Sequence, residues 1–207
     1  MQKPLLACAV ALVLGAAVSP AFAQSQGDWT LGVGIHAVDP KSDNGRLADG
    51  ALKVDVDTDV KPTLTFEYFV RDNLGIEVIA AWPFEHDIAI AGLGNVGSTK
   101  QLPPTVSLQY HFNSKGKVSP FLGAGINYTT FFSEDTRGAL EGARIKLDDS
   151  WGLAAHAGLD FAVGERSAIR VDARWIDIDT DVKLNGAGIG TVNIDPIVYG
   201  AAYVMKF

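Results

Sequence analysis

Charged and imidazole side chains occur at alternate positions in several segments of the sequence, and they are the groups that could perform chemistry. They are Glu67, Glu77, His111, Asp160, Arg170 and Asp172. Both neighbours of each are apolar, so in an extended chain the charged groups share one face and the apolar groups the other. Carboxylates packed against a guanidinium pair with it by charge-assisted hydrogen bonds. We therefore predict a buried charge network that blocks the interior of the fold.

Histidines suggest a second kind of chemistry. The four are His36, His86, His111 and His156, and three of them share the charged register. Imidazole binds metals and acts as a general base. Polar filling of a tight interior explains the same pattern more simply. We expect no catalytic residue, no metal and no cofactor.

Two acidic runs offer carboxylate oxygens to a cation. Residues 55–59 read DVDTD and residues 177–181 read DIDTD. A divalent cation held there could also bridge phosphates of lipopolysaccharide. Neither run has the glycine and closing glutamate of a calcium loop. We favour solvated acidic loops, with cation binding as the open alternative.

The N-terminus indicates export. A basic start precedes an apolar run over residues 5–18, and Ala21-Phe22-Ala23 is a small-x-small cleavage site. This predicts a cleaved signal peptide, residues 1–23, and one mature domain, residues 24–207. The only cysteine, Cys8, leaves with the signal peptide. The mature chain is then free of thiols and disulfides, as suits an oxidising compartment.

Composition limits the partners. The net charge is −7 and there is no basic stripe, which argues against nucleic acid. Beyond the signal peptide no apolar stretch is long enough for a transmembrane helix. Membrane insertion would therefore require strands.

Period-two alternation predicts eight such strands. Their apolar registers lie in residues 29–37, 64–70, 74–84, 106–112, 122–128, 151–161, 169–175 and 197–207. The last strand runs to an aromatic residue, and we read Tyr203 and Phe207 as the signal for the outer-membrane assembly machinery. An even strand count suits a closed antiparallel barrel.

The connections predict an orientation. Short polar turns at residues 71–73, 113–117 and 164–167 alternate with long segments at residues 39–57, 87–99, 133–150 and 179–193. Transmembrane barrels have short periplasmic turns and long extracellular loops. Within the third long segment, residues 136–147 carry apolar groups at helical spacing, so we expect a short helix there.

A soluble barrel that binds its ligand inside, as lipocalins do, is the alternative fold. It does not account for one face that is charged and another that is apolar with aromatic residues near the strand ends. Those aromatic residues are Trp29, Trp82, Phe84, Tyr110, Phe112, Trp151, Trp175, Tyr203 and Phe207. Such residues form girdles at the membrane interfaces. The fold class is therefore all-β, an eight-stranded antiparallel transmembrane barrel in the outer membrane of a Gram-negative cell.

Several motifs resemble the OmpW family of outer-membrane proteins. Residues 102–112 (LPPTVSLQYHF) resemble its fourth strand and residues 120–132 (PFLGAGINYTTFF) its fifth. Further marks are DSWG at 149–152, WIDIDT at 175–180 and DP at 195–196. The first and fourth long segments carry no matching motif. The resemblance implies a narrow, partly hydrophobic lumen and uptake of small hydrophobic molecules. Related proteins assist alkane uptake, and some serve as colicin or phage receptors.

The inward-facing positions of the predicted strands also indicate which side chains line the lumen. An eight-stranded barrel holds little more than its own side chains. The charge network would plug the periplasmic end. The outer half would be an apolar path lined by Ile79, Ala81, Phe131, Ala154, Ile176 and Val198.

Prolines predict a side exit from this path. Pro83 and the pair Pro103-Pro104 fall in two neighbouring strands, and proline cannot donate to a strand ladder. Interrupted pairing there would open a lateral window to the bilayer. The simpler alternative is that the fourth strand ends at the pair. The window is supported mainly by the family resemblance.

Three functions are consistent with this sequence. The first is a channel for passive uptake of a small hydrophobic solute, in contact with outer-membrane lipid and lipopolysaccharide. The second is a lipid-modifying barrel enzyme, although residues 24–28 are too short for the amphipathic helix of the lipid A acyltransferases. The third is a structural or adhesive barrel that acts through its extracellular loops.

Overall fold

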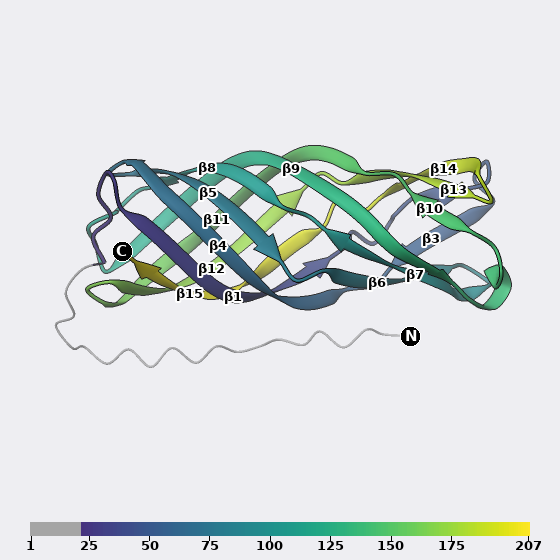
Figure 1. Ribbon diagram of the computed structural model, residues 1–207, viewed down its shortest axis with the longest axis horizontal. Coiled ribbons are helices and arrows are strands. Elements are labelled where there is room, and N and C mark those ends of the chain that lie inside the picture. The colour runs from purple at the N-terminus through teal and green to yellow at the C-terminus, as the bar shows by residue number, and fades with distance from the viewer. Residues whose placement is uncertain (1–21) are drawn as a thin grey trace.

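The computed structural model describes residues 22–207, which form one long closed cylinder of antiparallel strands (Figure 1). In order around the wall, the eight barrel strands are β1 (Trp29–Asp39), β4 (Asp59–Arg71), β5 (Leu74–Ala81), β8 (Thr105–His111), β9 (Val118–Thr136), β11 (Ser150–Gly164), β12 (Ser167–Ile176) and β15 (Ile197–Lys206). The ring closes where β15 pairs with β1, with Leu31 opposite Met205. The predicted fold class is confirmed.

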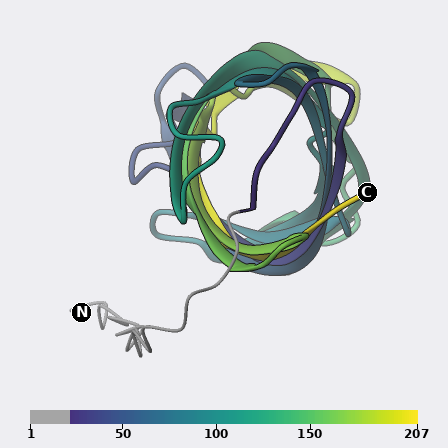
Figure 2. The same cartoon turned by 90° about the vertical axis from the view of Figure 1, so that its left-hand side faces the viewer.

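Short turns gather at one end of the cylinder. Two residues join β4 to β5 and two join β11 to β12, whereas six join β8 to β9. The C-terminus and the first described residues lie at this same end, which Figure 2 views directly. We assign it to the periplasm because outer-membrane barrels have their short turns there. Residues 1–21, with Cys8 and most of the expected signal peptide 1–23, lie outside the described residues.

At the opposite end, additional short strands and one helical turn continue the cylinder past the eight-stranded barrel, and we call this part the extension. Its elements are β2 (Arg46–Leu47), β3 (Leu52–Val56), β6 (Phe84–Ile90), β7 (Gly94–Leu102), η1 (Gly138–Leu140), β10 (Ile145–Leu147), β13 (Asp179–Leu184) and β14 (Ala187–Asn193). Strand β9, 19 residues long, pairs with β8 and β11 in the barrel and with β7 in this extension. The segments expected to be loops are thus largely hairpins. Among the described residues no helix is long and apolar enough to cross a membrane.

The helix expected at residues 136–147 is wrong in extent. Only the three residues of η1 are helical, in a 3₁₀ turn, and Ile145–Leu147 form strand β10 against β13. The apolar residues that mimic a helical period instead face the interior, as Leu147 does with 4% exposure. Pairing with a neighbouring strand has outweighed a weak local pattern.

Side chains alternate across the wall. In β4, Thr63, Thr65 and Glu67 are buried inside the cylinder, whereas Leu64 and Phe66 are exposed outside. A face of exposed leucine and phenylalanine is stable only against hydrocarbon. Aromatic clusters mark the borders of this face. Trp29 contacts Phe66 and Tyr68 near the periplasmic end.

One aromatic residue does not belong to the outer face. Phe84, expected in an interfacial girdle, is 2% exposed and lies in the apolar core. Strand β5 ends at Ala81 and β6 begins at Phe84, with Pro83 between them. The two intervening residues reset the register, so the alternation read through residue 84 places this side chain on the wrong face.

Candidate functional site in the barrel lumen

Arg170 holds three carboxylates together inside the barrel. Its Nε lies 2.7 Å from Asp160 Oδ1. Its Nη1 donates to Glu77 Oε2 at 2.9 Å and its Nη2 to Glu67 Oε2 at 3.2 Å. The guanidinium also lies over the ring of Phe121, 4.5 Å from the centroid. Arg170 is 2% exposed, so these contacts replace water almost completely.

Geometry explains why an arginine is needed here. Glu67 and Glu77 are direct partners across β4 and β5, a position where like charges repel. The fork of Arg170 donates to both, which turns a repulsive pair into a bridged one. Gly75 supplies the space, because a Cβ at this position would overlap the Glu67 carboxylate.

Polar side chains extend the network toward β11. His111 Nε2 lies 2.9 Å from Glu67 Oε1, and the Gln109 amide donates to Glu67 at 3.1 Å. His156 Nε2 lies 2.7 Å from Gln109 Oε1. All four side chains are at most 4% exposed. His111 and His156 therefore fill the lumen as polar links between strands.

Arg174 is the member that the sequence reading left out of the network. Its Nη2 donates to Glu77 Oε1 at 2.6 Å. Within residues 22–207, its Nε and Nη1 are buried without a hydrogen-bond partner. Arg174 stands four residues after Arg170 on the same inward register, and this spacing is the signal that could have identified it. The partner Glu77 lies on β5, which is not adjacent to β12.

Asp172 lies in the lumen but does not contact Arg170. It is 3.1 Å from His36 Nε2, and His36 Nδ1 is 2.6 Å from Thr63 Oγ1. Of the six side chains predicted to block the lumen, the structure therefore joins five in one network, in which Arg170 contacts Asp160, Glu77 and Glu67, and Glu67 contacts His111. The sixth, Asp172, lies in a neighbouring pair with His36.

The first described residues cross the periplasmic mouth (Figure 2). Gln24 is fully buried, and its amide donates to Asp160 Oδ2 at 3.3 Å. Lys206 donates to the Ala23 carbonyl and lies 3.3 Å from Asp28. Residues 24–28 (QSQGD) show no period and no apolar side chain, so nothing in the sequence marks them as a cover for the barrel mouth.

Apolar side chains fill the lumen beyond the charge network. The residues predicted to line this upper lumen are all on the inner face: Ile79, Ala81, Phe131, Ala154, Ile176 and Val198. They join a core that continues into the extension through Leu47, Val54, Leu147 and Val192. The cavity within the extension is small, about 30 Å³. That volume suits one or two waters, so a larger solute must displace side chains to pass.

The strand ladder is interrupted beside the upper lumen. Strands β5 and β8 are paired up to Ile79 and Thr105, and pairing resumes between β6 and β7 at Phe84 and Gln101. Residues 80–83 and 102–104 thus have no partner across this line, and we call these seven residues the wall break. Pro83, Pro103 and Pro104 all fall within it. A cavity of about 20 Å³ adjoins it, lined by residues that include Ala80, Ala81 and Pro103.

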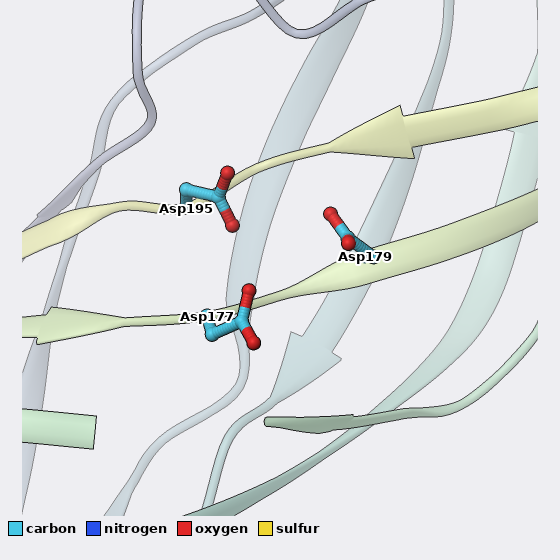
Figure 3. A group of neighbouring side chains, drawn as sticks. All are labelled: Asp177, Asp179 and Asp195. Carbon is cyan, nitrogen blue, oxygen red and sulfur yellow. The ribbon is translucent and has the colours of Figure 1, made fainter. Parts of the chain in front are cut away.

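Three aspartates meet at the outer rim (Figure 3). Carboxylate oxygens of Asp177, Asp179 and Asp195 all lie within 4.8 Å of one another, the only such group in residues 22–207 that could hold a metal. Burial, and then the charges of the other two, raise the pKa of Asp177. Lys41 lies 2.6 Å from Asp195 and supplies a positive charge. The cluster involves the second acidic run but not the first.

Comparison with known proteins agrees with this architecture. Residues 25–207 match the OmpW family. Outer membrane protein W of Vibrio cholerae serotype O1 is 34% identical over 97% of this chain and 98% of its own length. A Pseudomonas aeruginosa protein named for a dibenzothiophene metabolism operon, PahQ, is 27% identical over 80% of each chain.

A solved structure supports the same assignment. The crystal structure of the outer membrane protein OprG from Pseudomonas aeruginosa superposes with a TM-score of 0.82 at 34% identity, covering 90% of this chain and 99% of that one. Outer membrane protein W and OprG are outer-membrane proteins rather than enzymes, and they place this protein in the outer membrane, as its sequence predicts. The chain belongs to the OmpW family.

Proposed function

We propose that this protein conducts small hydrophobic molecules across the outer membrane through its upper lumen. The observation that carries the proposal is the division of the lumen into an apolar outer half and a charged periplasmic half. A hydrophobic solute gains by leaving water for the apolar half. PahQ, whose name connects it to dibenzothiophene metabolism, is a relative consistent with hydrophobic solutes.

The charge network acts as a periplasmic plug. Its members are Glu67, Glu77, His111, Asp160 and Arg170, to which we add Arg174, and Asp172 contributes beside them through its pair with His36. Buried charges with fixed partners cannot move aside without losing several kcal/mol, on the order of 3–5 for one broken pair. Gln24 adds a second cover at the mouth by its hydrogen bond to Asp160. A solute that has reached the upper lumen would therefore not continue straight into the periplasm.

The exit is the wall break, which acts as a lateral window. Residues 80–83 can move apart from residues 102–104 without breaking ladder hydrogen bonds, because no ladder pairing joins the two segments. On either side the wall stays fixed, because Trp82 N donates to the Pro62 carbonyl and Tyr128 N to the Pro104 carbonyl. The window would thus release a solute sideways into the bilayer while the rest of the barrel remains closed.

Other partners follow from the same surfaces. The outer face contacts membrane lipid, and the rim cluster of Asp177, Asp179 and Asp195 could bind a cation that bridges lipopolysaccharide phosphates. The final strand, with Tyr203 and Phe207 exposed on the outside, serves the assembly machinery. The mature domain is residues 24–207, with signal cleavage after Ala23.

Acidic substitutions inside the upper lumen test the proposal. Ile79 is 7% exposed and Phe131 is 2% exposed, so Ile79→Asp with Phe131→Asp puts charges where a hydrophobic solute must pass. An unpaired buried charge is costly, and uptake of a hydrophobic probe should fall about tenfold or more. Small-ion conductance should hold or rise because water enters.

The comparison is made in cells at matched surface levels. Ile126→Asp places the same charge on the lipid face, where Ile126 is 57% exposed, and should impair assembly instead of selectivity. Undiminished uptake by a folded double variant would reject the lumenal route. It would favour the adhesive alternative, in which only the extracellular loops matter.

A further inference from the structure

The cavity within the extension contains a small polar group in an otherwise apolar lining. His86, Thr99 and Gln101 contribute it from β6 and β7. The other lining residues are aliphatic, apart from Phe131. Gln101 lies opposite Phe84 on β6 and Phe131 on β9, so it stands between two aromatic rings at the upper border of the wall break.

Hydrogen bonds fix the orientation of the Gln101 amide. His86 Nδ1 lies 2.7 Å from the Asp57 carbonyl, which can only accept, so Nδ1 carries the proton. Burial lowers the pKa of His86, which keeps the ring neutral and leaves Nε2 as an acceptor. The group 2.9 Å from Nε2 must then be the amide nitrogen of Gln101.

This chain of bonds leaves one oxygen unused. Gln101 is fully buried, and its Oε1 has no hydrogen-bond partner within residues 22–207. The Thr99 hydroxyl does not supply a donor, since it donates to the Lys100 carbonyl at 3.4 Å. A buried acceptor without a donor destabilises a fold, so Oε1 needs a donor from outside the chain. A water fits the cavity, and the hydroxyl of a solute that displaces this water can take over the same hydrogen bond.

We propose that Gln101 Oε1 accepts a hydrogen bond from the hydroxyl group of the solute, so that the preferred substrates are hydrophobic molecules carrying one hydroxyl, such as aliphatic alcohols or phenols. The inference rests on the proposed function and names the substrate class of the same lumen. Neutral Gln101 and neutral His86 offer no countercharge. A carboxylate or an ammonium would therefore lose its hydration without compensation.

The position of Gln101 makes this contact a filter before the exit. A solute moving from the extension toward the window passes Phe131 and Phe84, which flank the amide. The aromatic rings favour any apolar body. The amide oxygen separates a hydroxylated solute from the hydrocarbon of the same length, because only the former satisfies the acceptor.

The test compares uptake of 1-octanol with uptake of n-octane in cells expressing the protein. Gln101→Leu removes the acceptor and should lower the ratio of octanol to octane uptake by about five- to tenfold, the factor expected for one lost hydrogen bond. Uptake of octane should hold or rise. Gln101→Met is a second variant of nearly the same shape, with only a weak acceptor, and should give the same result.

Gln26→Leu is the matched control, because it makes the same exchange at an exposed position outside the lumen. Folding of each variant is checked by heat-dependent migration of the barrel on a gel. An unchanged ratio in both folded Gln101 variants would overturn the hydroxyl filter while leaving the channel intact. If neither solute depends on the protein for uptake, the proposed function fails, and the filter fails with it.

Discussion

Arg170 donates hydrogen bonds to Asp160, Glu67 and Glu77 at once, and two of these acceptors face each other across adjacent strands. Removing it would leave three buried carboxylates close together. The inward-facing charges of the network comprise four carboxylates, namely Glu67, Glu77, Asp160 and Asp172, against the two guanidiniums of Arg170 and Arg174. The balance thus depends on both arginines.

Arg170→Ala should therefore destabilise the barrel by about 3–5 kcal/mol, or admit water and open a leak. The leak should select cations, because the carboxylates that remain outnumber Arg174. Melting in detergent and reversal potentials in planar bilayers measure the two effects. Arg166→Ala, at an exposed arginine in the adjacent turn, is the control. Unchanged melting together with unchanged conductance would remove Arg170 from the plug.

For individual residues, the sequence predicted which charged side chains face inward but not all of their ion-pair partners. Arg170 and Asp160 are direct partners on adjacent strands, so alternation and hairpin register were enough to pair them. Arg174 and Glu77 lie on β12 and β5, which meet only across the lumen. Their contact depends on the stagger of the strands around the whole barrel, and the alternation within a single strand does not reveal this stagger.

Among the elements, the pairs β5–β8 and β6–β7 matter most, because the wall break separates them. Proline removes the backbone donor that a continuous ladder would need. Pro83 also resets the register that places Phe84 inside, which is why alternation alone put this residue in the outer girdle. The hairpin strands of the extension were also missed, because some of them show no alternation of side chains. Strand β14, for example, contains two glycines, so it has little side-chain alternation to read.

Restoring the ladder should close the proposed lateral window. The triple change Pro83→Val, Pro103→Thr and Pro104→Val supplies backbone donors and β-branched side chains on both sides of the break. We expect unchanged or higher thermal stability together with uptake of a hydrophobic probe reduced about tenfold. Pro120→Val, in β9 near the periplasmic end, replaces a proline away from the break and should leave uptake unchanged. Normal uptake by the folded triple variant would argue against lateral release.

As a whole molecule, the protein is a cylinder whose interior changes character along its axis. The extension and outer barrel share one apolar core, and the periplasmic half holds paired charges beneath the mouth that residues 24–28 cross. The eight strands were predictable because the membrane imposes a continuous apolar face on each. The extension was not, since its outer surface meets water and follows no such rule.

The most direct test of this account is to locate a hydrophobic solute inside the protein. A photoactivatable alkyl probe, added from outside to cells expressing the protein and then illuminated, marks the residues along its route for mass spectrometry. The account predicts labels on Phe131, Ile79 and the wall-break residues Ala81 and Pro103, with none on Gln109 or His111 in the plug. Labels confined to lipid-facing residues such as Ile126 and Leu153, with none in the upper lumen, would contradict it.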